Sequence, residues 1–258
     1  MYLLKQWRES RIISILAILG LALLLAMAVK GWFAIDTVNF DNRNYHGDFG
    51  PAFVPLFYVE AVLVAFWGWL AAGIGTGKNL GEGSGSFLLT RPRRRAWFLW
   101  NDWGYAMAQI AAIIVLANLM IGLLLAHILH LMRLPTAVPL TETGDPVSLA
   151  VILVVISIGV LLFAGLIYGL TYFSTIILQR TSGVMLGAGI IVAYLIFGGL
   201  IHHYYSTVHL PNLIVGLFQV ESHHLTFASH LAAKMIVRAA VVMAFPIAAQ
   251  LILDRSEI

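Results

Sequence analysis

Residues 147–178 read VSLAVILVVISIGVLLFAGLIYGLTYFSTIIL, an apolar stretch without a single charged side chain. A helix rises about 1.5 Å per residue, so about 20 apolar residues cross the roughly 30 Å hydrocarbon layer of a bilayer. This stretch exceeds that length, and we expect it to tilt or to extend into the cytosol. It predicts a membrane-spanning helix, because a water-soluble globule could not cover so long an apolar run.

Five other stretches are also long and apolar enough to span a bilayer. The sequence therefore predicts an all-α integral membrane protein, a single transmembrane domain over residues 1–258, with spans at about 12–35, 52–75, 105–131, 147–178, 184–201 and 235–253. The composition agrees, since 60% of the residues are hydrophobic and 10% are charged, against about 25% charged in soluble domains. Basic residues and Ala26-Met27-Ala28 give the first stretch the layout of a secretory signal. Its length favours an uncleaved span.

The distribution of basic residues predicts the orientation. Lys and Arg are about twice as frequent on one side of the predicted spans as on the other, and basic loops face the cytoplasm. We therefore expect both termini in the cytoplasm. The cytoplasmic set is Lys5, Arg8, Arg11, Lys78, Arg91, Arg93, Arg94, Arg95, Arg180 and Arg255, and the opposite set is Lys30, Arg43, Arg133, Lys234 and Arg238. A net charge of +3 then reflects topology, and nucleic acid is not expected as a partner.

The segment between the second and third predicted spans, residues 76–104, is more than a simple connection. Over residues 81–100 it reads GEGSGSFLLTRPRRRAWFLW, a glycine–serine stretch followed by a short apolar step, a proline and a basic–aromatic run. Arginines beside Trp97, Phe98 and Trp100 suit a short helix at the membrane surface, where they would meet lipid headgroups or an acidic partner. The same arginines also fit ordinary positive-inside topology.

The order of residues in this segment resembles the cytoplasmic loop of ABC-2 type transporter permeases. The match runs from Glu82 through Arg95: an acidic residue, small residues, Leu-Leu-Thr-x-Pro and arginine. The six spans and the overlong fourth span agree with the same family. The resemblance assigns coupling to an ATPase to Glu82, Phe87, Leu88, Leu89, Pro92, Arg93, Arg94 and Arg95.

By this resemblance the chain is the permease subunit of an ATP-driven exporter, a multi-pass protein in the inner (plasma) membrane of a prokaryote. Residues 76–104 would carry a coupling helix that docks on a separate cytoplasmic ATPase subunit, present in two copies. A second permease copy or a related permease, surrounded by membrane lipid, would complete the pathway. ATP and Mg would be bound by the ATPase, so this chain would need no cofactor and no catalytic residue of its own.

The predicted external segment, residues 202–234, is too apolar for a plain loop. Its centre, Leu213–Phe218, predicts a re-entrant or interfacial helix before the sixth span, as the resemblance also implies. All nine histidines lie on or near this side of the membrane. Imidazole binds metal without cysteine, which the chain lacks. The candidate metal ligands are His127, His130, His202, His203, His223 and His224, and a haem- or metal-binding redox subunit is the alternative function. Interfacial or polar lining roles would suit the same histidines.

Polar and small residues inside the spans are the remaining candidates for a role in the pathway or in helix packing. Glu60 in the second span is costly at that depth unless it faces a cavity or a partner, so it predicts either a translocation cleft or a structural pair with Lys30 or Arg238. Asn118 in the third span is the second candidate for the pathway, and such residues also tie helices together. Residues 73–79 resemble a phosphate-binding loop but lack its required Gly and Ser or Thr, which indicates a helix end. Gly165/Gly169 and Gly183/Gly187 have the spacing of close helix packing.

Overall fold

The computed structural model of the 258-residue chain describes residues 11–12, 14–23, 26, 50–73, 95–131, 137–139, 146–178, 183–190, 218–221, 224–227 and 230–255. Four long helices dominate this part of the chain: α2 (Gly50–Ala72), α5 (Arg95–Leu131), α6 (Leu149–Leu178) and α8 (Leu231–Arg255). Residues 14–23 and 183–190 are also helical. Within the described ranges the fold is therefore a helical bundle with two small strand pairs.

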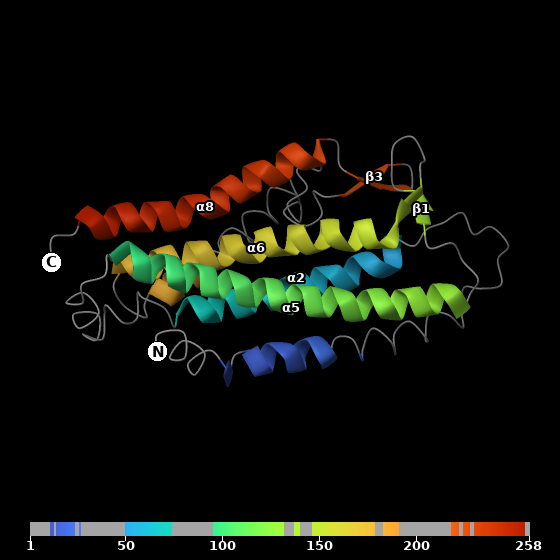
Figure 1. Cartoon of the computed structure of the whole chain (residues 1–258), viewed down its shortest axis with the longest axis horizontal. Helices are drawn as coiled ribbons and strands as arrows, with labels where there is room; N and C mark the ends of the chain where they lie inside the picture. Colours follow the sequence, from blue (N-terminus) through green and yellow to red (C-terminus); the bar gives the residue numbers. More distant parts are fainter. Residues whose placement is uncertain are drawn as a thin grey trace.

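The long helices lie side by side along the long axis of the molecule; α2, α6 and α8 run in one direction and α5 runs in the opposite direction (Figure 1). We call one end of the bundle the Arg95 end, because α5 begins there. Helices α2, α6 and α8 all finish at that end (Figure 1). At the opposite end, the Leu231 end, α5 finishes and α2, α6 and α8 begin.

Two antiparallel strand pairs flank helices at the Leu231 end. Strand β1 (Ala137–Pro139) pairs with β2 (Pro146–Ser148), which leads directly into α6. Strand β3 (Phe218–Glu221) pairs with β4 (His224–Phe227), which precedes α8. The prediction of a helix is therefore wrong at Phe218, the end of the apolar segment 213–218, because residues 218–221 form a strand that pairs with residues 224–227. Residues 213–217 lie outside the described residues.

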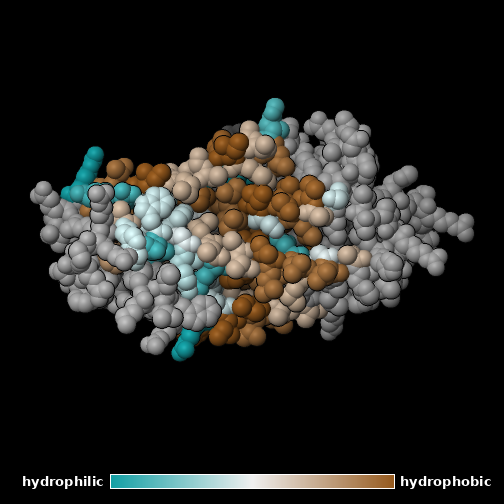
Figure 2. Space-filling model, viewed as in Figure 1, coloured by the Kyte–Doolittle hydropathy of each residue, from teal (hydrophilic) through white to brown (hydrophobic). Residues whose placement is uncertain are grey.

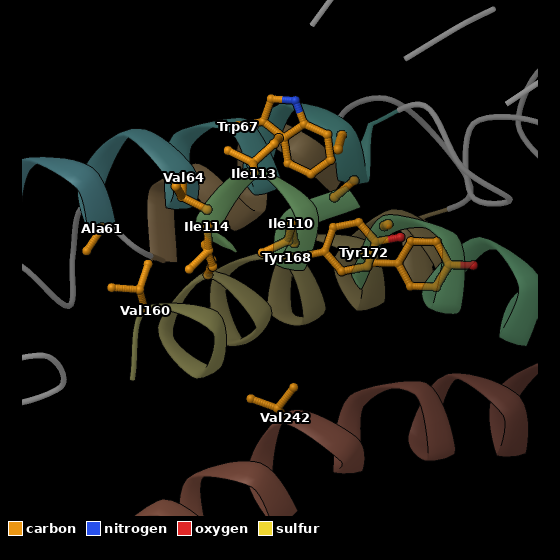
Figure 3. Packing of buried hydrophobic residues seen from close by; sticks show 14 of the residues in the cluster. Ala61, Val64, Trp67, Ile110, Ile113, Ile114, Val160, Tyr168, Tyr172 and Val242 are labelled. Carbon is orange, nitrogen blue, oxygen red and sulfur yellow. The ribbon is translucent and has the colours of Figure 1, made fainter. Parts of the chain in front are cut away.

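Helix α6 is the centre of the bundle and contacts α2, α5 and α8. Its buried side chains include Val160, Tyr168 and Tyr172, and all three belong to the common hydrophobic core (Figure 3). The rings of Tyr168 and Tyr172 stack at 5.4 Å, and the ring of Trp103 on α5 lies 5.2 Å from Tyr168. These aromatic contacts join α5 to α6 over the half of α6 that is nearer the Arg95 end.

Glycines let the helices approach closely, as their spacing predicts. A Cβ on Gly165 would lie 3.0 Å from Met107 and 3.1 Å from Val242, and one on Gly169 would lie 2.8 Å from Phe245. At Gly183 the contact is with backbone, since a Cβ would collide with the Cα of Thr175. In a membrane the hydrophobic effect does not drive helices together, and small side chains instead let the helix backbones approach closely enough for tight packing. The packing role of both glycine pairs is confirmed.

The outer faces of the helices are apolar, as expected for a protein surrounded by lipid. Leu123 on α5 is 64% exposed and Ile236 on α8 is 69% exposed, and hydrophobic residues gather over the middle of the described surface (Figure 2). Three helical segments, Ala96–Leu123, Ala150–Leu178 and Leu231–Arg255, are long and apolar enough to cross a membrane. These three helices, found in the described part of the chain, indicate a multi-pass membrane protein.

The helix bounds agree with several predicted spans and correct one. Helix α8 covers the sixth span and contains Pro246. Helix α2 covers the second span as far as Ala72, and α6 covers the fourth from Leu149, because the first two residues of that span, Val147 and Ser148, belong to β2. Residues 14–23 and 183–190 are the described helical parts of the first and fifth. The third helix begins at Arg95 and not near residue 105, because Phe98, Leu99 and Trp103 are buried in the bundle and extend it. Helix α2 ends at Ala72 with a turn at Gly73, which confirms the helix end predicted there.

Candidate functional site

A cluster of polar side chains lies inside the bundle where α2, α5 and α6 meet. Glu60 on α2 is 0% exposed. It stands ten residues after Gly50, about 15 Å along a helix of 23 residues, and therefore near the middle of α2. Asn118 on α5 is buried beside it. The two residues predicted for the pathway are therefore brought together, within the bundle and away from its outer surface.

The amide of Asn118 joins three helices. Its Nδ2 donates to Glu60 Oε1 on α2 at 3.2 Å and to Ser157 Oγ on α6 at 2.9 Å. The Ser157 hydroxyl in turn donates to the Leu153 carbonyl at 2.7 Å. An amide nitrogen has two hydrogens and a hydroxyl has one, so every donor of this chain of bonds is used. We refer to Glu60, Asn118 and Ser157 as the polar cluster.

Two acceptor atoms of the polar cluster remain open. Glu60 Oε2 and Asn118 Oδ1 are buried without a hydrogen-bond partner in the described part of the chain. A buried acceptor without a donor costs about 1–3 kcal/mol. The cluster thus joins three helices. Its two open oxygen atoms can still accept hydrogen bonds from a donor such as a water molecule, and the carboxylate can take up a proton.

Among the described residues, the hydrogen-bond partner of Glu60 is the amide of Asn118 and not Arg238. Lys30 lies outside the described residues. Arg238 is on α8, where it lines a cavity between α6 and α8 with Leu162, Phe163 and other apolar residues. The sequence did not single out Ser157. The signal available for it was a hydroxyl inside a long apolar run, on the face of α6 that meets α5.

The described part of the basic–aromatic segment, residues 95–100, forms the first turns of α5. Phe98 is buried in the bundle, so its predicted role as a membrane-surface anchor is wrong. Trp100 Nε1 donates to Gln250 Oε1 on α8 at 2.9 Å, which joins the beginning of α5 to the last turns of α8. Gln250 was not among the residues expected from the sequence.

The residues assigned to ATPase coupling lie almost entirely outside the described residues. These are Glu82, Phe87, Leu88, Leu89, Pro92, Arg93 and Arg94; only Arg95, the first residue of α5, is described. The described structure fixes where the segment must begin and end. It leaves α2 after Gly73 and enters α5 at Arg95, and both points lie at the Arg95 end of the bundle (Figure 1).

The described residues contain no group of three or more potential metal ligands. His127 and His130 belong to helix α5, as predicted, and His224 belongs to strand β4. His202, His203 and His223 lie outside the described residues. The metal-binding alternative therefore gains no support from the described part of the structure.

The chain was also compared with known proteins. No family model, no curated protein and no solved structure matches it.

Proposed function

We propose that this chain is the permease subunit of an ATP-driven transporter of the ABC-2 type, acting as an exporter. It would cross the membrane six times, with the Arg95 end in the cytoplasm. Two copies, or one copy and a related permease, would form the pathway, and two ATPase subunits would bind the segments between α2 and α5. The primary support is the residue order from Glu82 through Arg95, which resembles the coupling loop of that family.

A second support for this proposal is the continuity of α5 from Arg95 to the polar cluster. The helix has 37 residues, so it is about 55 Å long and exceeds the roughly 30 Å hydrocarbon layer. Its first residue, Arg95, is the last residue of the motif that resembles the coupling loop. Asn118 is 23 residues further along, at about 35 Å. One rigid element therefore connects the proposed ATPase contact with the buried polar residues.

A mechanism follows from this connection. When the ATPase subunits close, they would move the docking segment and with it the beginning of α5. A shift of α5 changes the position of Asn118 relative to Glu60 and Ser157, and the two hydrogen bonds of its amide would break together. The polar cluster would then act as a lock that holds α2, α5 and α6 in one arrangement, in the manner of a two-state packed element.

The orientation has separate support in the charge distribution. Ten of the 15 Lys and Arg residues fall on the side that the topology assigns to the cytoplasm, and basic loops remain on that side during insertion. The described helix directions agree with an alternating path through the membrane (Figure 1). The loop with Lys78 and Arg91 to Arg95 would therefore face the compartment that contains ATP.

The test is ATP hydrolysis by the complex purified from the native host. We expect Glu82→Gln, and separately the triple change of Arg93, Arg94 and Arg95 to Ala, to abolish most of the ATPase activity that co-purifies with the chain. Arg255→Ala is the matched control, because it removes a positive charge at the same end of the bundle from α8. If both docking variants keep normal ATPase stimulation and transport, the assignment of this segment is wrong.

A further inference from the structure

The helices that meet at the polar cluster bring no opposite charge close to Glu60. Helix α2 packs on α5 and α6. Glu60 is the one Asp, Glu, His, Lys or Arg residue of α2, and α6 contains none. On α5 the nearest to Asn118 is His127, nine residues or about 14 Å along the helix. The others on α5 are Arg95, Asp102 and His130. Tyrosine hydroxyls on these helices are neutral below about pH 10.

The remaining described elements do not supply a counter-charge either. Residues 14–23 and 183–190 contain no Asp, Glu, His, Lys or Arg. Helix α8 packs on α5 and α6, and its Arg238 lines a cavity with Leu162 and Leu166. At 3.6 residues per turn these two leucines lie about 140° and 180° around α6 from Ser157. Arg238 therefore contacts the face of α6 opposite the polar cluster. The other charged residues of α8 are Lys234, Asp254 and Arg255.

One proton would satisfy both open atoms of the polar cluster. In the described part of the chain these are Glu60 Oε2 and Asn118 Oδ1, and they belong to two groups that the bond from Nδ2 to Oε1 already joins at 3.2 Å. A proton on Oε2 turns this acceptor into a donor, and Asn118 Oδ1 is the acceptor beside it. The acid and the amide would then pair through two parallel hydrogen bonds.

Two other occupants fit the cluster less well. A water molecule could donate to both open oxygens, but the carboxylate would keep its charge in surroundings where an unpaired charge is costly. A divalent metal ion takes six or more oxygen ligands, whereas the cluster offers two open oxygens. A proton both removes the charge and completes the hydrogen bonds, so it is the occupant that the geometry favours.

We propose that Glu60 is a proton-binding site, and that the neutral acid pairs with the Asn118 amide in this arrangement of the bundle. The O–H bond forms at Oε2 with a proton from water, and the proton returns to water when α2 and α5 separate. Proton binding therefore stabilises the contact of α2 with α5. The site depends on the packing of these helices and not on the transport function proposed above.

Infrared spectroscopy of the purified full-length chain in detergent tests the protonation. At about pH 6 an exposed glutamate is ionised, since its ordinary pKa is about 4.3. We expect the wild type to show the carbonyl stretch of a neutral carboxylic acid, and Glu60→Gln to lose it. Asp254→Asn is the matched control, because it removes an exposed carboxyl group at the end of α8 and should keep the band. Identical spectra of the wild type and Glu60→Gln in this region would overturn the proposal.

The same band reports the partner of the acid. Asn118→Leu should move it to higher frequency, because the carbonyl and the hydroxyl of the acid both lose their hydrogen bonds. An unmoved band would overturn the pairing with Asn118. Replacing choline chloride by sodium chloride in the buffer should leave the band in place. Its loss in sodium would identify a metal cation as the occupant instead.

The pH dependence of unfolding is an independent measurement. Above about pH 4.3 an unfolded glutamate releases its proton, so the folded wild type binds one proton more than the unfolded chain. Relative to Glu60→Gln, which is neutral in both states, the folding equilibrium constant of the wild type should fall about tenfold per pH unit until the folded state also releases the proton. Unfolding midpoints that change in parallel with pH in the two proteins would contradict the site.

Discussion

The amide nitrogen of Asn118 lies 3.2 Å from Glu60 Oε1 and joins α5 to α2 in the interior of the bundle. The same nitrogen reaches Ser157 on α6, so one side chain connects three helices. The carboxyl group of Glu60 is tolerated in this position because the Asn118 amide donates a hydrogen bond to it. The Ser157 hydroxyl holds that amide in place by accepting its other hydrogen. Stability and movement of the bundle should therefore both depend on Asn118.

Replacing Asn118 by Leu should destabilise the protein by about 1–2 kcal/mol. The change removes both donors and leaves Glu60 buried without its hydrogen bond, although interhelical bonds in membranes average less than this. The measurement is the midpoint of thermal unfolding of the purified chain in detergent. Glu60→Gln should stay close to the wild type, since its side-chain carbonyl accepts the same bond.

Asn101→Leu is the matched control for this change. Asn101 is also an amide on α5, but its Nδ2 donates to the Trp97 carbonyl of its own helix at 2.7 Å. It does not join α5 to another helix through this bond, so its loss should lower the unfolding midpoint less. A decrease as large as that of Asn118→Leu would show that the interhelical bonds have no special importance.

Gly183→Ala should destabilise the contact between residues 183–190 and α6. A Cβ at this position would lie 2.6 Å from the Ser174 carbonyl oxygen and closer still to Thr175, and backbone cannot move aside as a flexible side chain does. We expect a loss of roughly 1–3 kcal/mol, the scale of overpacking. Gly189→Ala serves as the control on the same helical segment, because nothing lies within 4 Å of its Cβ. Unfolding midpoints that fall equally for both variants would contradict this packing.

Single cysteines should report the two ends of α8 from opposite sides of the membrane. The natural chain has no cysteine, so Arg255→Cys and His230→Cys each introduce one thiol into an exposed position. A membrane-impermeant maleimide should label position 230 in intact cells, after removal of the outer membrane where one exists. It should label position 255 only after lysis. Labelling of both from one side would show that α8 does not span the membrane.

Hydropathy predicted most helices well, because the cost of placing polar groups in lipid leaves few alternatives for long apolar runs. The beginning of α5 was missed for a related reason. Asn101 and Asp102 interrupt the apolar pattern there, whereas burial of Leu99 and Trp103 against other helices continues the helix. Such tertiary contacts are not visible in a local window.

The candidate site was predictable in part. Glu60 and Asn118 stand out as polar residues within spans, but their partnership depends on which helix faces meet. Strands β3 and β4 could not be predicted from the local sequence, because a short apolar run fits a helix and a strand equally well. Only the pairing of β3 with β4 distinguishes the two.

The central claim is that the segment between α2 and α5 docks on an ATPase, and photo-cross-linking tests it most directly. A photoreactive amino acid is placed at Leu88 in the native host, and at Ala232, which is exposed at the Leu231 end, as the control. The adducts are identified by mass spectrometry. We predict a cross-link from position 88 to an ATP-binding subunit of the ABC type and none from position 232. The absence of such a subunit among the adducts at position 88, or the same adduct from both positions, would contradict the account.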